Sequence, residues 1–181
     1  MKTKRAVVLR GDVAIVPLTR GYEAIVDAEF AERVAQWNWA AFVQRGGAYV
    51  YARRSSLRPS RRTFYLHREV AEWNGLFSAE NDNADLEVDH INGNPLDNRL
   101  RNLRVCLHAE NSKNRRRHRD NTSGAKGVHW NSRNRKWQAL IQVDGQRIHL
   151  GCFNDPAEAA AAYEAAAELH FGAFKRAVEN Y

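Results

Sequence analysis

The chain has 181 residues, which is enough for one ordinary domain or two small ones, and its formal net charge is +7. No apolar run reaches the roughly 18 residues of a membrane helix, and Arg10 and Asp12 interrupt the first apolar run, which argues against a signal peptide. We therefore expect a protein that does not bind a membrane. Cys106 and Cys152 each stand alone, so we expect no disulfide framework, no cysteine zinc site and a cytoplasmic location.

The basic excess lies mainly in the C-terminal part of the chain. Residues 113–181 hold 12 Lys and Arg against 7 Asp and Glu, whereas residues 1–112 hold 16 against 14. Such a concentration favours a polyanionic partner such as a nucleic acid, although solubility alone could account for a moderate excess. The charge therefore indicates a class of partner, and the motifs must decide whether it applies.

Residues 1–63 are expected to form a strand-rich segment. Strands are predicted at 13–17 and 48–52, and the spacing of Phe30, Val34 and Trp37 predicts a short helix with a core-facing side. Five arginines then crowd one stretch, either as a solvated loop or as a phosphate-binding patch, and a DNA-cleaving function would favour the patch. These are Arg53, Arg54, Arg58, Arg61 and Arg62.

The Asn-rich middle of the chain predicts a strand, a loop, a second strand and a helix. Residues 86–88 can pair as a strand that ends at Asp89, and residues 103–106 can return as its partner. Between them, residues 92–98 are rich in Asn, Asp, Gly and Pro, which is strong turn chemistry. A helix is expected over 108–117.

The polar residues of this stretch suit phosphodiester hydrolysis. A hard divalent cation prefers oxygen ligands, which Asp89 and Asn111 could supply while leaving positions for water and phosphate. A neutral His90 could take a proton from an attacking water, because imidazole titrates near neutral pH. The alternative is structural, since an Asp-His pair is common and Asn-Gly or Asn-Pro alone indicates only a turn.

Residues 64–117 closely resemble the HNH nuclease family, in the branch of phage and intron homing endonucleases. The resemblance rests on the sequence DHINGNPLDNRLRNLRVCLHAEN at 89–111, together with Leu-His-Arg at 66–68. It implies a ββα-metal fold that hydrolyses DNA with one divalent metal and without a small-molecule cofactor.

The resemblance also implies a role for each polar residue. His90 matches the general base, and Asp89 matches a metal ligand. Asn102 matches the middle Asn of the motif, which ties the loop together and helps to orient the base. Asn111 matches the last motif position, where many relatives carry His, and its amide oxygen suits Mg²⁺ better than zinc, with Mn²⁺ as the alternative. His67 matches a recurrent helix histidine that either touches the scissile phosphate or caps or packs.

A basic segment separates this region from the C-terminal one. Residues 113–123 include five Lys or Arg and end in Asp-Asn-Thr-Ser, which predicts the end of the helix and then a basic linker at 118–123. The segment could follow a DNA backbone or act only as a flexible linker, and the two readings are compatible. The expected division of the chain is therefore 1–63, 64–117, 118–123 and 124–181.

The turn sequence Asp144-Gly145 predicts a two-residue β-hairpin and sets its register. One face becomes apolar, and its expected pairs are Ile141 with Ile148, Ala139 with Leu150, and Trp137 with Cys152. The other face becomes polar and basic, and its expected pairs are Gln142 with Arg147, Leu140 with His149, and Gln138 with Gly151. An Ala-rich helix should follow, with Asp155 as N-cap, Pro156 at its first position and Gly172 as its stop.

Residues 124–180 resemble the plant ethylene-response-factor (Apetala-type) DNA-binding domain. The resemblance rests on Lys-Gly-Val at 126–128, Lys-Trp at 136–137, Leu-Gly-Cys-Phe at 150–153 and the Ala-rich run at 157–163. It implies a three-stranded antiparallel sheet, packed on one helix, that enters the major groove of double-stranded DNA. By position, the DNA-facing residues are His129, Asn131, Arg133, Gln142, Arg147 and His149. Because His129 and His149 replace Arg and Trp of the plant members, their target sequence does not carry over.

Together the patterns predict an α+β, site-directed, homing-type DNA endonuclease that acts in a bacterial or phage-infected cell. The chain holds one set of motif residues, so we expect a monomer that nicks one strand at a time. A DNA-binding regulator with an inactive nuclease fold is the main alternative. A structural phage protein that uses its sheet for protein contacts is another.

Overall fold

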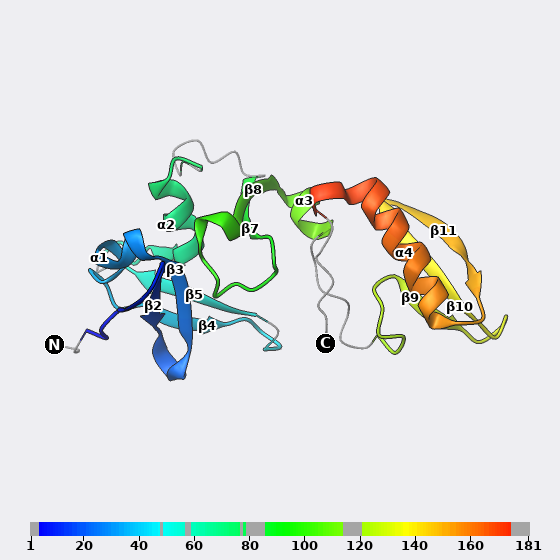
Figure 1. Ribbon diagram of the computed structural model, residues 1–181, viewed down its shortest axis with the longest axis horizontal. Coiled ribbons are helices and arrows are strands. Elements are labelled where there is room, and N and C mark those ends of the chain that lie inside the picture. The colour runs from blue at the N-terminus through cyan, green and yellow to red at the C-terminus, as the bar shows by residue number, and fades with distance from the viewer. Residues whose placement is uncertain are drawn as a thin grey trace. The chain divides into compact units, whose positions relative to one another are not determined.

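The computed structural model of the protein describes residues 4–47, 49–56, 59–76, 78, 86–113 and 121–174. Figure 1 shows its elements in chain order, coloured from the N-terminus to the C-terminus. Contacts along the chain divide it into two compact units, Met1–His108 and Ala109–Tyr181. No helix of the described residues is long and apolar enough to cross a membrane.

The described part of the first unit contains small antiparallel sheets and short helices. Its sheets are β1 (Val8–Arg10) with β2 (Val13–Pro17) and β3 (Glu23–Asp27), β4 (Ala40–Val43) with β5 (Val50–Ser55) and β6 (Thr63–Tyr65), and β7 (Leu86–His90) with β8 (Leu103–Leu107). Its helices are η1 (Thr19–Gly21), η2 (Ala28–Phe30), α1 (Ala31–Val34), α2 (Leu66–Trp73) and η4 (Leu100–Asn102), and α3 (His108–Lys113) begins at its last residue.

One apolar core joins the elements of the first unit. Trp39 and Leu66 are almost completely buried in it, and Val88 of β7 and Leu103 of β8 belong to the same cluster. The strand-rich segment and the Asn-rich stretch therefore pack as one body. This division differs from the boundary predicted at residue 63, because buried side chains on both sides of that residue share a single core.

Strand β3 also holds the loop that follows β7. The amide of Ile25 donates to the carbonyl of Leu96 at 2.8 Å, and the carbonyl of Ile25 accepts from the amide of Asn98 at 2.7 Å. The carboxylate of Asp27 accepts from the amide of Leu100 at 2.7 Å. The N-terminal segment thus supports the backbone of the Asn-rich loop directly, a role that its sequence did not indicate.

The helix predicted from the spacing of Phe30, Val34 and Trp37 is shorter than expected, because α1 covers only Ala31–Val34 after the 3-10 turn η2. The indole nitrogen of Trp39 donates to the carbonyl of Val34 at 3.0 Å, which takes an acceptor that a longer helix would have used. Phe30 and Val34 are buried and Trp37 packs against the same core, so their prediction as core residues is confirmed.

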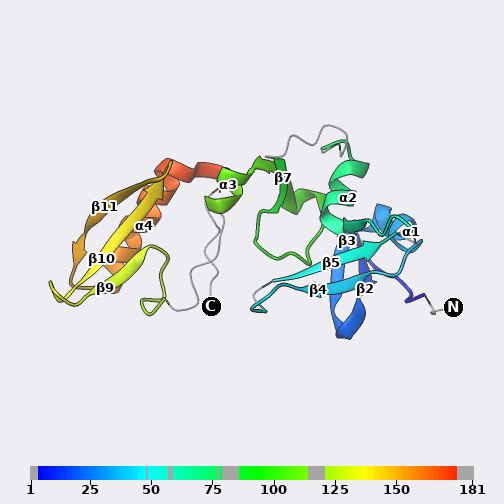
Figure 2. The same cartoon turned by 180° about the vertical axis from the view of Figure 1, so that it is seen from behind.

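The second unit is one antiparallel sheet covered by one helix. Its strands β9 (Val128–Asn131), β10 (Lys136–Val143) and β11 (Gln146–Phe153) lie in the order β11-β10-β9, and α4 (Pro156–Phe171) and η5 (Gly172–Phe174) follow them. The helix α4 lies along one face of the sheet and leaves the other face open, as Figures 1 and 2 show from opposite sides.

The predicted limits of the C-terminal helix are confirmed. The carboxylate of Asp155 accepts from the amide of Ala157 at 2.8 Å, Pro156 occupies the first turn, and the helix ends at Gly172, whose φ is 49°. Because an Ala-rich face lets a helix approach a sheet closely, Ala159 and Ala167 are almost completely buried there together with Tyr163.

The register of the hairpin is as predicted only beside its turn. Ile141 pairs with Ile148, and the pairs on either side of it are also as expected. Beyond them Leu150 is an extra residue on β11, so the prediction of an uninterrupted ladder was wrong. The observed pairs there are Ala139 with Gly151, Gln138 with Cys152, and Trp137 with Phe153.

A β-bulge at Leu150 and Gly151 causes this shift in register, and Leu150 packs against the core there. The φ of Gly151 is 140°, and a Cβ atom there would lie 2.9 Å from the ring of Phe153, so only glycine fits. As a consequence Cys152 lies opposite Gln138 on the polar face and not opposite Trp137.

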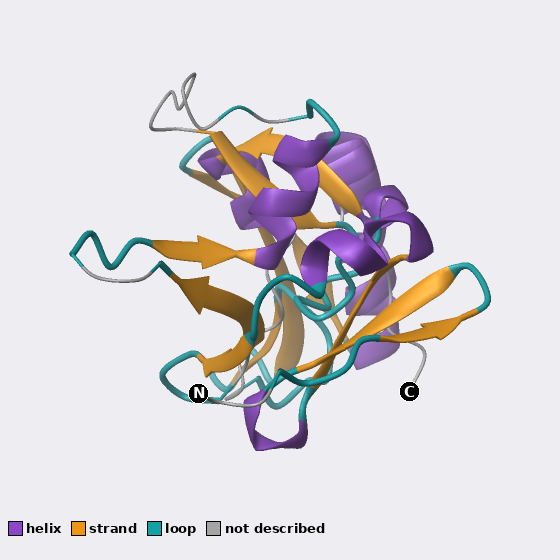
Figure 3. Cartoon of the chain, turned by 90° about the vertical axis from the view of Figure 1, so that its left-hand side faces the viewer, coloured by secondary structure: helices purple, strands orange, loops and turns teal. Residues whose placement is uncertain are grey.

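The predicted α+β class is confirmed by the short strands and few helices of the described chain (Figure 3). Part of the predicted linker at 118–123 belongs to the second unit. The side chain of Asn121 donates to the carbonyls of Ala125 and Val128 at 2.8 and 3.1 Å, and Ser123 bonds to the same two carbonyls. Residues 118–120 lie outside the described residues.

Candidate active site and nucleic-acid interface

Asn102 fastens the loop between β7 and β8. Its Nδ2 donates to the carbonyl of Asp97 at 2.7 Å and to Oδ1 of Asn92 at 3.0 Å, and its Oδ1 accepts from the amide of Asn92 at 3.0 Å. The side chain of Asn102 is almost completely buried. This amide therefore joins the two ends of the loop, while its part in catalysis stays a prediction.

An ion pair stiffens the same loop. Arg99 donates through Nε and Nη2 to the two carboxylate oxygens of Asp97, at 2.7 and 2.6 Å. Although burial acts in the opposite direction, Arg99 holds the pKa of Asp97 below its usual value. The carboxylate therefore stays ionised and keeps accepting from Nδ2 of Asn92 at 3.0 Å.

His90 stands at the end of β7 and is only 5% exposed. Its Nε2 lies 3.3 Å from Oδ1 of Asn98, and its ring centre lies 5.0 Å from that of His67. Burial lowers the pKa of His90, although Asn98 and the neighbouring carboxylates of Asp89 and Asp97 act in the opposite direction. The imidazole is therefore neutral at neutral pH, which is the state that a proton acceptor requires.

The side chain of Asn98 indicates which tautomer His90 adopts. Asn98 has no exposed surface, and its Nδ2 donates to the carbonyl of Leu96 at 3.1 Å and lies 3.5 Å from that of Pro95. Since these carbonyls require the amide nitrogen on their side, Oδ1 faces His90 and can only accept. Nε2 of His90 then carries the proton, and Nδ1 is the unprotonated ring nitrogen.

His67, in helix α2, is buried beside His90. Its ring centre lies 5.8 Å from that of Tyr51 and 5.7 Å from that of Tyr65. Burial lowers its pKa well below the usual value, and His90 and Arg68 lower it further. Nδ1 of His67 has no hydrogen-bond partner among the described residues. His67 thus packs within the site, and its contact with a scissile phosphate stays a prediction.

Asp89 is buried and faces Arg104 across the β7–β8 ladder. Nε and Nη2 of Arg104 donate to Oδ2 of Asp89 at 3.0 and 2.7 Å. A carboxylate offers about four acceptor positions on its two oxygens, so this ion pair does not use up the group. Carboxylate and amide oxygens are ligands that a hard cation such as Mg²⁺ prefers, and the metal-binding roles of Asp89 and Asn111 stay predictions.

Asn111 lies in helix α3, which begins at His108 as predicted and is described as far as Lys113. The remainder of the predicted helix, 114–117, lies outside the described residues. Nδ1 of His108 lies 2.7 Å from Oε1 of Glu87. In the described part of the chain no three His, Cys, Asp or Glu residues cluster as metal ligands.

The five arginines at 53–62, predicted as a solvated loop or a phosphate-binding patch, differ in their surroundings. Arg54 donates to both carboxylate oxygens of Glu69 at 2.6 and 3.0 Å, and its guanidinium lies 4.1 Å from the ring centres of Trp37 and Phe64. Arg54 is therefore part of the packing, and both sequence readings were wrong for it. Of the others, Arg53 is half-buried, Arg61 and Arg62 are exposed, and Arg58 lies outside the described residues.

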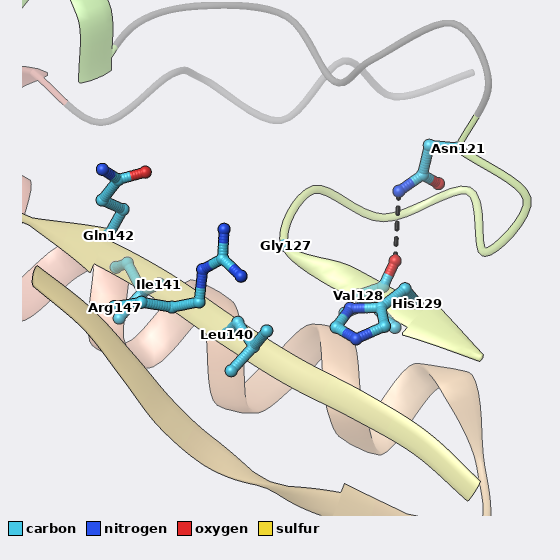
Figure 4. Close-up of a pocket in the computed structure, with 8 residues that line it drawn as sticks. All are labelled: Asn121, Gly127, Val128, His129, Leu140, Ile141, Gln142 and Arg147. Atoms are coloured by element: carbon cyan, nitrogen blue, oxygen red, sulfur yellow. Dashed lines mark hydrogen bonds between the residues drawn. The ribbon is translucent and has the colours of Figure 1, made fainter. Parts of the chain in front are cut away.

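Three of the predicted DNA-facing residues gather on the open face of the second unit. His129, Gln142 and Arg147 line a shallow hollow of about 380 Å³. Figure 4 shows Gln142 and Arg147 on the near side of the sheet, with α4 behind it, and Asn121 bonded to the carbonyl of Val128. The hollow therefore presents amide, imidazole and guanidinium groups on the face of the sheet opposite α4.

The other three predicted residues have local partners. Oδ1 of Asn131 accepts from the amides of Arg133 and Asn134 at 3.1 and 3.2 Å, which caps the turn between β9 and β10. Nε2 of His149 lies 3.6 Å from Sγ of Cys152, a neighbour that the bulge brings to this face. The roles of Asn131, Arg133 and His149 in DNA binding stay predictions.

Over 89 residues the chain is 40% identical to protein 3.8 of Escherichia phage T7, in an alignment that covers 49% of this chain and 73% of that protein. The chain belongs to the protein 3.8 family. Its residues 81–113 also match the family model of HNH endonucleases, which supports a nuclease that acts on DNA. No solved structure matches this member of the protein 3.8 family.

The HNH match supports the predicted nuclease region and does not extend to the predicted C-terminal DNA-binding domain. Residues 81–113 include Asp89, His90, Asn102 and Asn111, so the resemblance to HNH nucleases is confirmed for this stretch. The second unit has the sheet and helix that an ethylene-response-factor-like domain requires. Its membership of that family, and its DNA binding, stay predictions.

Three residues of the site were missed by sequence reasoning. Asn98 was interpreted only as turn chemistry, and nothing in its neighbourhood indicated complete burial against His90. Arg104 could have been found, since pairing the strands predicted around Asp89 and 103–106 places it opposite Asp89. Tyr51, whose ring centre lies 6.4 Å from that of His90, comes from a distant strand that no local pattern connects to the motif.

Proposed function

We propose that this member of the protein 3.8 family is a metal-dependent, site-directed DNA endonuclease of the homing type. It hydrolyses phosphodiester bonds in double-stranded DNA and nicks one strand at a time. The observation that carries the proposal is the buried, neutral imidazole of His90, next to Asp89, inside the stretch that matches HNH endonucleases.

His90 acts as the general base. Its Nδ1 accepts a proton from a water molecule, whose oxygen attacks the phosphorus while the bond to the 3′ oxygen breaks. The 3′ oxygen takes up a proton, so the products are a 5′ phosphate and a 3′ hydroxyl. Asn98 holds the ring in the tautomer that this step needs, and Asn102 holds the loop between the two strands.

Asp89 and Asn111 would hold one divalent metal ion, Mg²⁺ or alternatively Mn²⁺. When bound, this ion would stabilise negative charge on the phosphate and on the leaving oxygen. Arg104 orients the carboxylate of Asp89 through its two hydrogen bonds and adds a positive charge beside it. His67 would lie against the substrate phosphate or support the ring of His90.

The second unit holds or selects the DNA site through its open sheet face. Support comes from the hollow lined by His129, Gln142 and Arg147 and from the basic excess of the C-terminal residues. In this proposal the protein works as a monomer in the cytoplasm of a bacterial or phage-infected cell, with DNA as its partner and no small-molecule cofactor.

Plasmid nicking tests this proposal. With Mg²⁺, the protein should convert supercoiled plasmid that carries DNA from the neighbourhood of its own gene to open circles, and excess chelator should abolish the reaction. His90→Ala should slow nicking by about 100- to 10,000-fold and leave DNA binding nearly unchanged. His170→Ala, which removes an exposed imidazole of α4, is the matched control. Nicking at the wild-type rate by His90→Ala would overturn the assignment of the base.

One observation favours a second function, a DNA-binding regulator whose nuclease fold is inactive. Arg104 already satisfies part of the carboxylate of Asp89, as would be expected if a structural ion pair had replaced a metal site. This function predicts DNA binding by the full chain with no nicking in Mg²⁺ or Mn²⁺. It also predicts that removing Asp89 lowers the stability of the protein without affecting any activity.

A further inference from the structure

The sheet β4-β5-β6 has two faces of different character. Side chains alternate along a strand, so Ala52 and Arg54 of β5 point to one face, and Tyr51 and Arg53 point to the other. Ala52 is buried in the core and Arg54 is bound to Glu69, so their face is the inner one.

The other face carries a continuous set of half-buried rings. Phe42 pairs with Tyr51 across β4 and β5, and Arg53 pairs with Tyr65 across β5 and β6. The ring centres lie 6.1 Å apart for Tyr51 and Tyr65 and 6.4 Å apart for Phe42 and Tyr65. We call the four residues Phe42, Tyr51, Arg53 and Tyr65 the aromatic face.

The aromatic face is continuous with the candidate active site. The ring of Tyr51 lies 5.8 Å from that of His67 and 6.4 Å from that of His90, and the ring of Tyr65 lies 5.7 Å from that of His67. Burial and then the neighbouring Tyr49 and Asp89 raise the pKa of Tyr51, so its hydroxyl stays protonated and can donate a hydrogen bond.

Arg53 is the charged member of this face, and its environment differs from that of Arg54. Its guanidinium carbon lies 4.3 Å from the ring centre of Phe42, a distance at which the ring attracts the positive charge. No carboxylate of the described residues forms an ion pair with it, whereas Arg54 bonds to both oxygens of Glu69. A half-buried guanidinium that forms no ion pair with the described residues is suited to receive an anion.

We propose that the aromatic face binds the DNA strand next to the phosphate that is cut, with Arg53 bound to a backbone phosphate of that strand. The guanidinium fork matches the geometry of phosphate oxygens, and the half-buried rings provide apolar area for sugars and bases. Arg53 lies two residues beyond Tyr51, about 7 Å along β5. Since DNA rises about 3.4 Å per nucleotide, the phosphate belongs within a few nucleotides of the cut.

This inference rests on the proposed function for the position of the cut, but its first test does not require cleavage. The full chain carrying His90→Ala is titrated with a duplex from the plasmid at several salt concentrations. Adding Arg53→Gln should lower the slope of log affinity against log salt by about 0.9, the value for one lost phosphate contact. Arg53→Lys, which keeps the charge, should retain most of the slope.

Arg10→Gln is the control, because it removes an exposed arginine of β1 in the same unit and should leave the slope unchanged. The thermal unfolding midpoint of each variant shows whether the fold is intact. An unchanged slope in a folded Arg53→Gln protein would overturn the proposal. If Arg53→Gln reduces the slope but the wild-type protein never nicks DNA, the aromatic face would still be a DNA-binding surface and only the nuclease function would be rejected.

A second test locates the phosphate. Duplexes with a mapped nick site carry one neutral methylphosphonate at a time along the cut strand. At one position near the nick, neutralisation should slow the wild type but have little further effect on Arg53→Gln, because both changes remove the same contact. Equal losses for both proteins at every position would show that Arg53 does not bind this strand.

Discussion

The side chain of Asn98 is completely buried and connects two loop carbonyls to the imidazole of His90. Because this side chain is not exposed, it cannot contact a substrate directly, and any effect of Asn98 on a reaction would pass through its contact with His90. This makes Asn98 a positioning residue, whose role can be separated from that of the base by combining substitutions.

We predict that Asn98→Ala slows nicking by on the order of 100-fold, because a misplaced base loses most of its advantage. The double variant Asn98→Ala/His90→Ala should be no slower than His90→Ala alone, since the amide acts only through the ring. Single-turnover nicking rates of the four proteins check this. Independent, multiplicative losses would show that Asn98 acts elsewhere, for example on the loop alone.

We also predict that acid destabilises the first unit through His67. The pKa of His67 is lowered in the folded state by burial, so the unfolded chain binds the proton more readily once the pH falls below about 6.5. The free energy of unfolding should therefore be highest above that pH and fall as the pH decreases further, by up to about 1.4 kcal/mol per pH unit for this group.

Urea unfolding of the wild type and of His67→Phe between pH 7 and pH 5 tests this expectation. The phenylalanine variant should lose less stability over the interval, because the titrating group is gone while His90 and its tyrosine neighbours remain. Identical pH dependence in the two proteins would mean that His67 does not carry the effect.

At this scale the sequence predicted which chemical groups gather but not what surrounds them. Asp89, His90 and Asn102 were predicted because local spacing carries the motif, and their roles stay predictions. Asn98 and Tyr51 were not found, because burial and ring contact depend on elements far away in the chain.

Among the elements, the strand pair β9–β10 depends on a close approach of backbone and side chain at Gly127. Its φ is 71°, and a Cβ atom there would lie 2.2 Å from the ring of Tyr163 and 2.5 Å from the carbonyl of Leu140. The amide of Leu140 also donates to the carbonyl of Gly127 at 2.8 Å. Helix, sheet and loop therefore meet at one residue that has no side chain.

We predict that Gly127→Ala lowers the free energy of unfolding of the second unit by at least about 1–3 kcal/mol, because the methyl group overpacks this contact. Gly145→Ala is the matched control: its φ is 80°, but no atom lies within 4 Å of the added Cβ, so it reports backbone strain alone. Hydrogen exchange of the β9 and β10 amides localises the loss. Equal effects of the two substitutions would contradict the packing explanation.

The same unit shows how far a turn can set the register of a hairpin. The positive φ values of Asp144 and Gly145, 48° and 80°, produce the expected two-residue turn, and the four pairs nearest to it follow. The bulge at Leu150 depends on packing against α4 and on the ring of Phe153, neither of which lies beside the turn in sequence. Local chemistry could therefore predict the strands and the helix, but not their full alignment.

For the whole molecule, the chain carries one Asp89–His90 pair, so a single copy can attack one phosphodiester bond at a time. We predict that supercoiled plasmid passes to open circle before any linear form appears, and that the initial nicking rate is proportional to enzyme concentration. Gel-resolved time courses over a tenfold range of enzyme check this. Linear DNA formed directly, at a rate that rises with the square of enzyme concentration, would instead require two copies.

The shared core of the first unit has a consequence for how such proteins can be assembled by gene exchange. A crossover at residue 63 would bring Val88 and Leu103 into a new protein without the members of their buried cluster that precede residue 63. It would also leave the loop around Asn98 without the strand β3 that carries it. A crossover after His108 keeps these contacts together. The smallest segment that keeps this core and its loop contacts together is therefore residues 1–108, and not the short motif at 89–111.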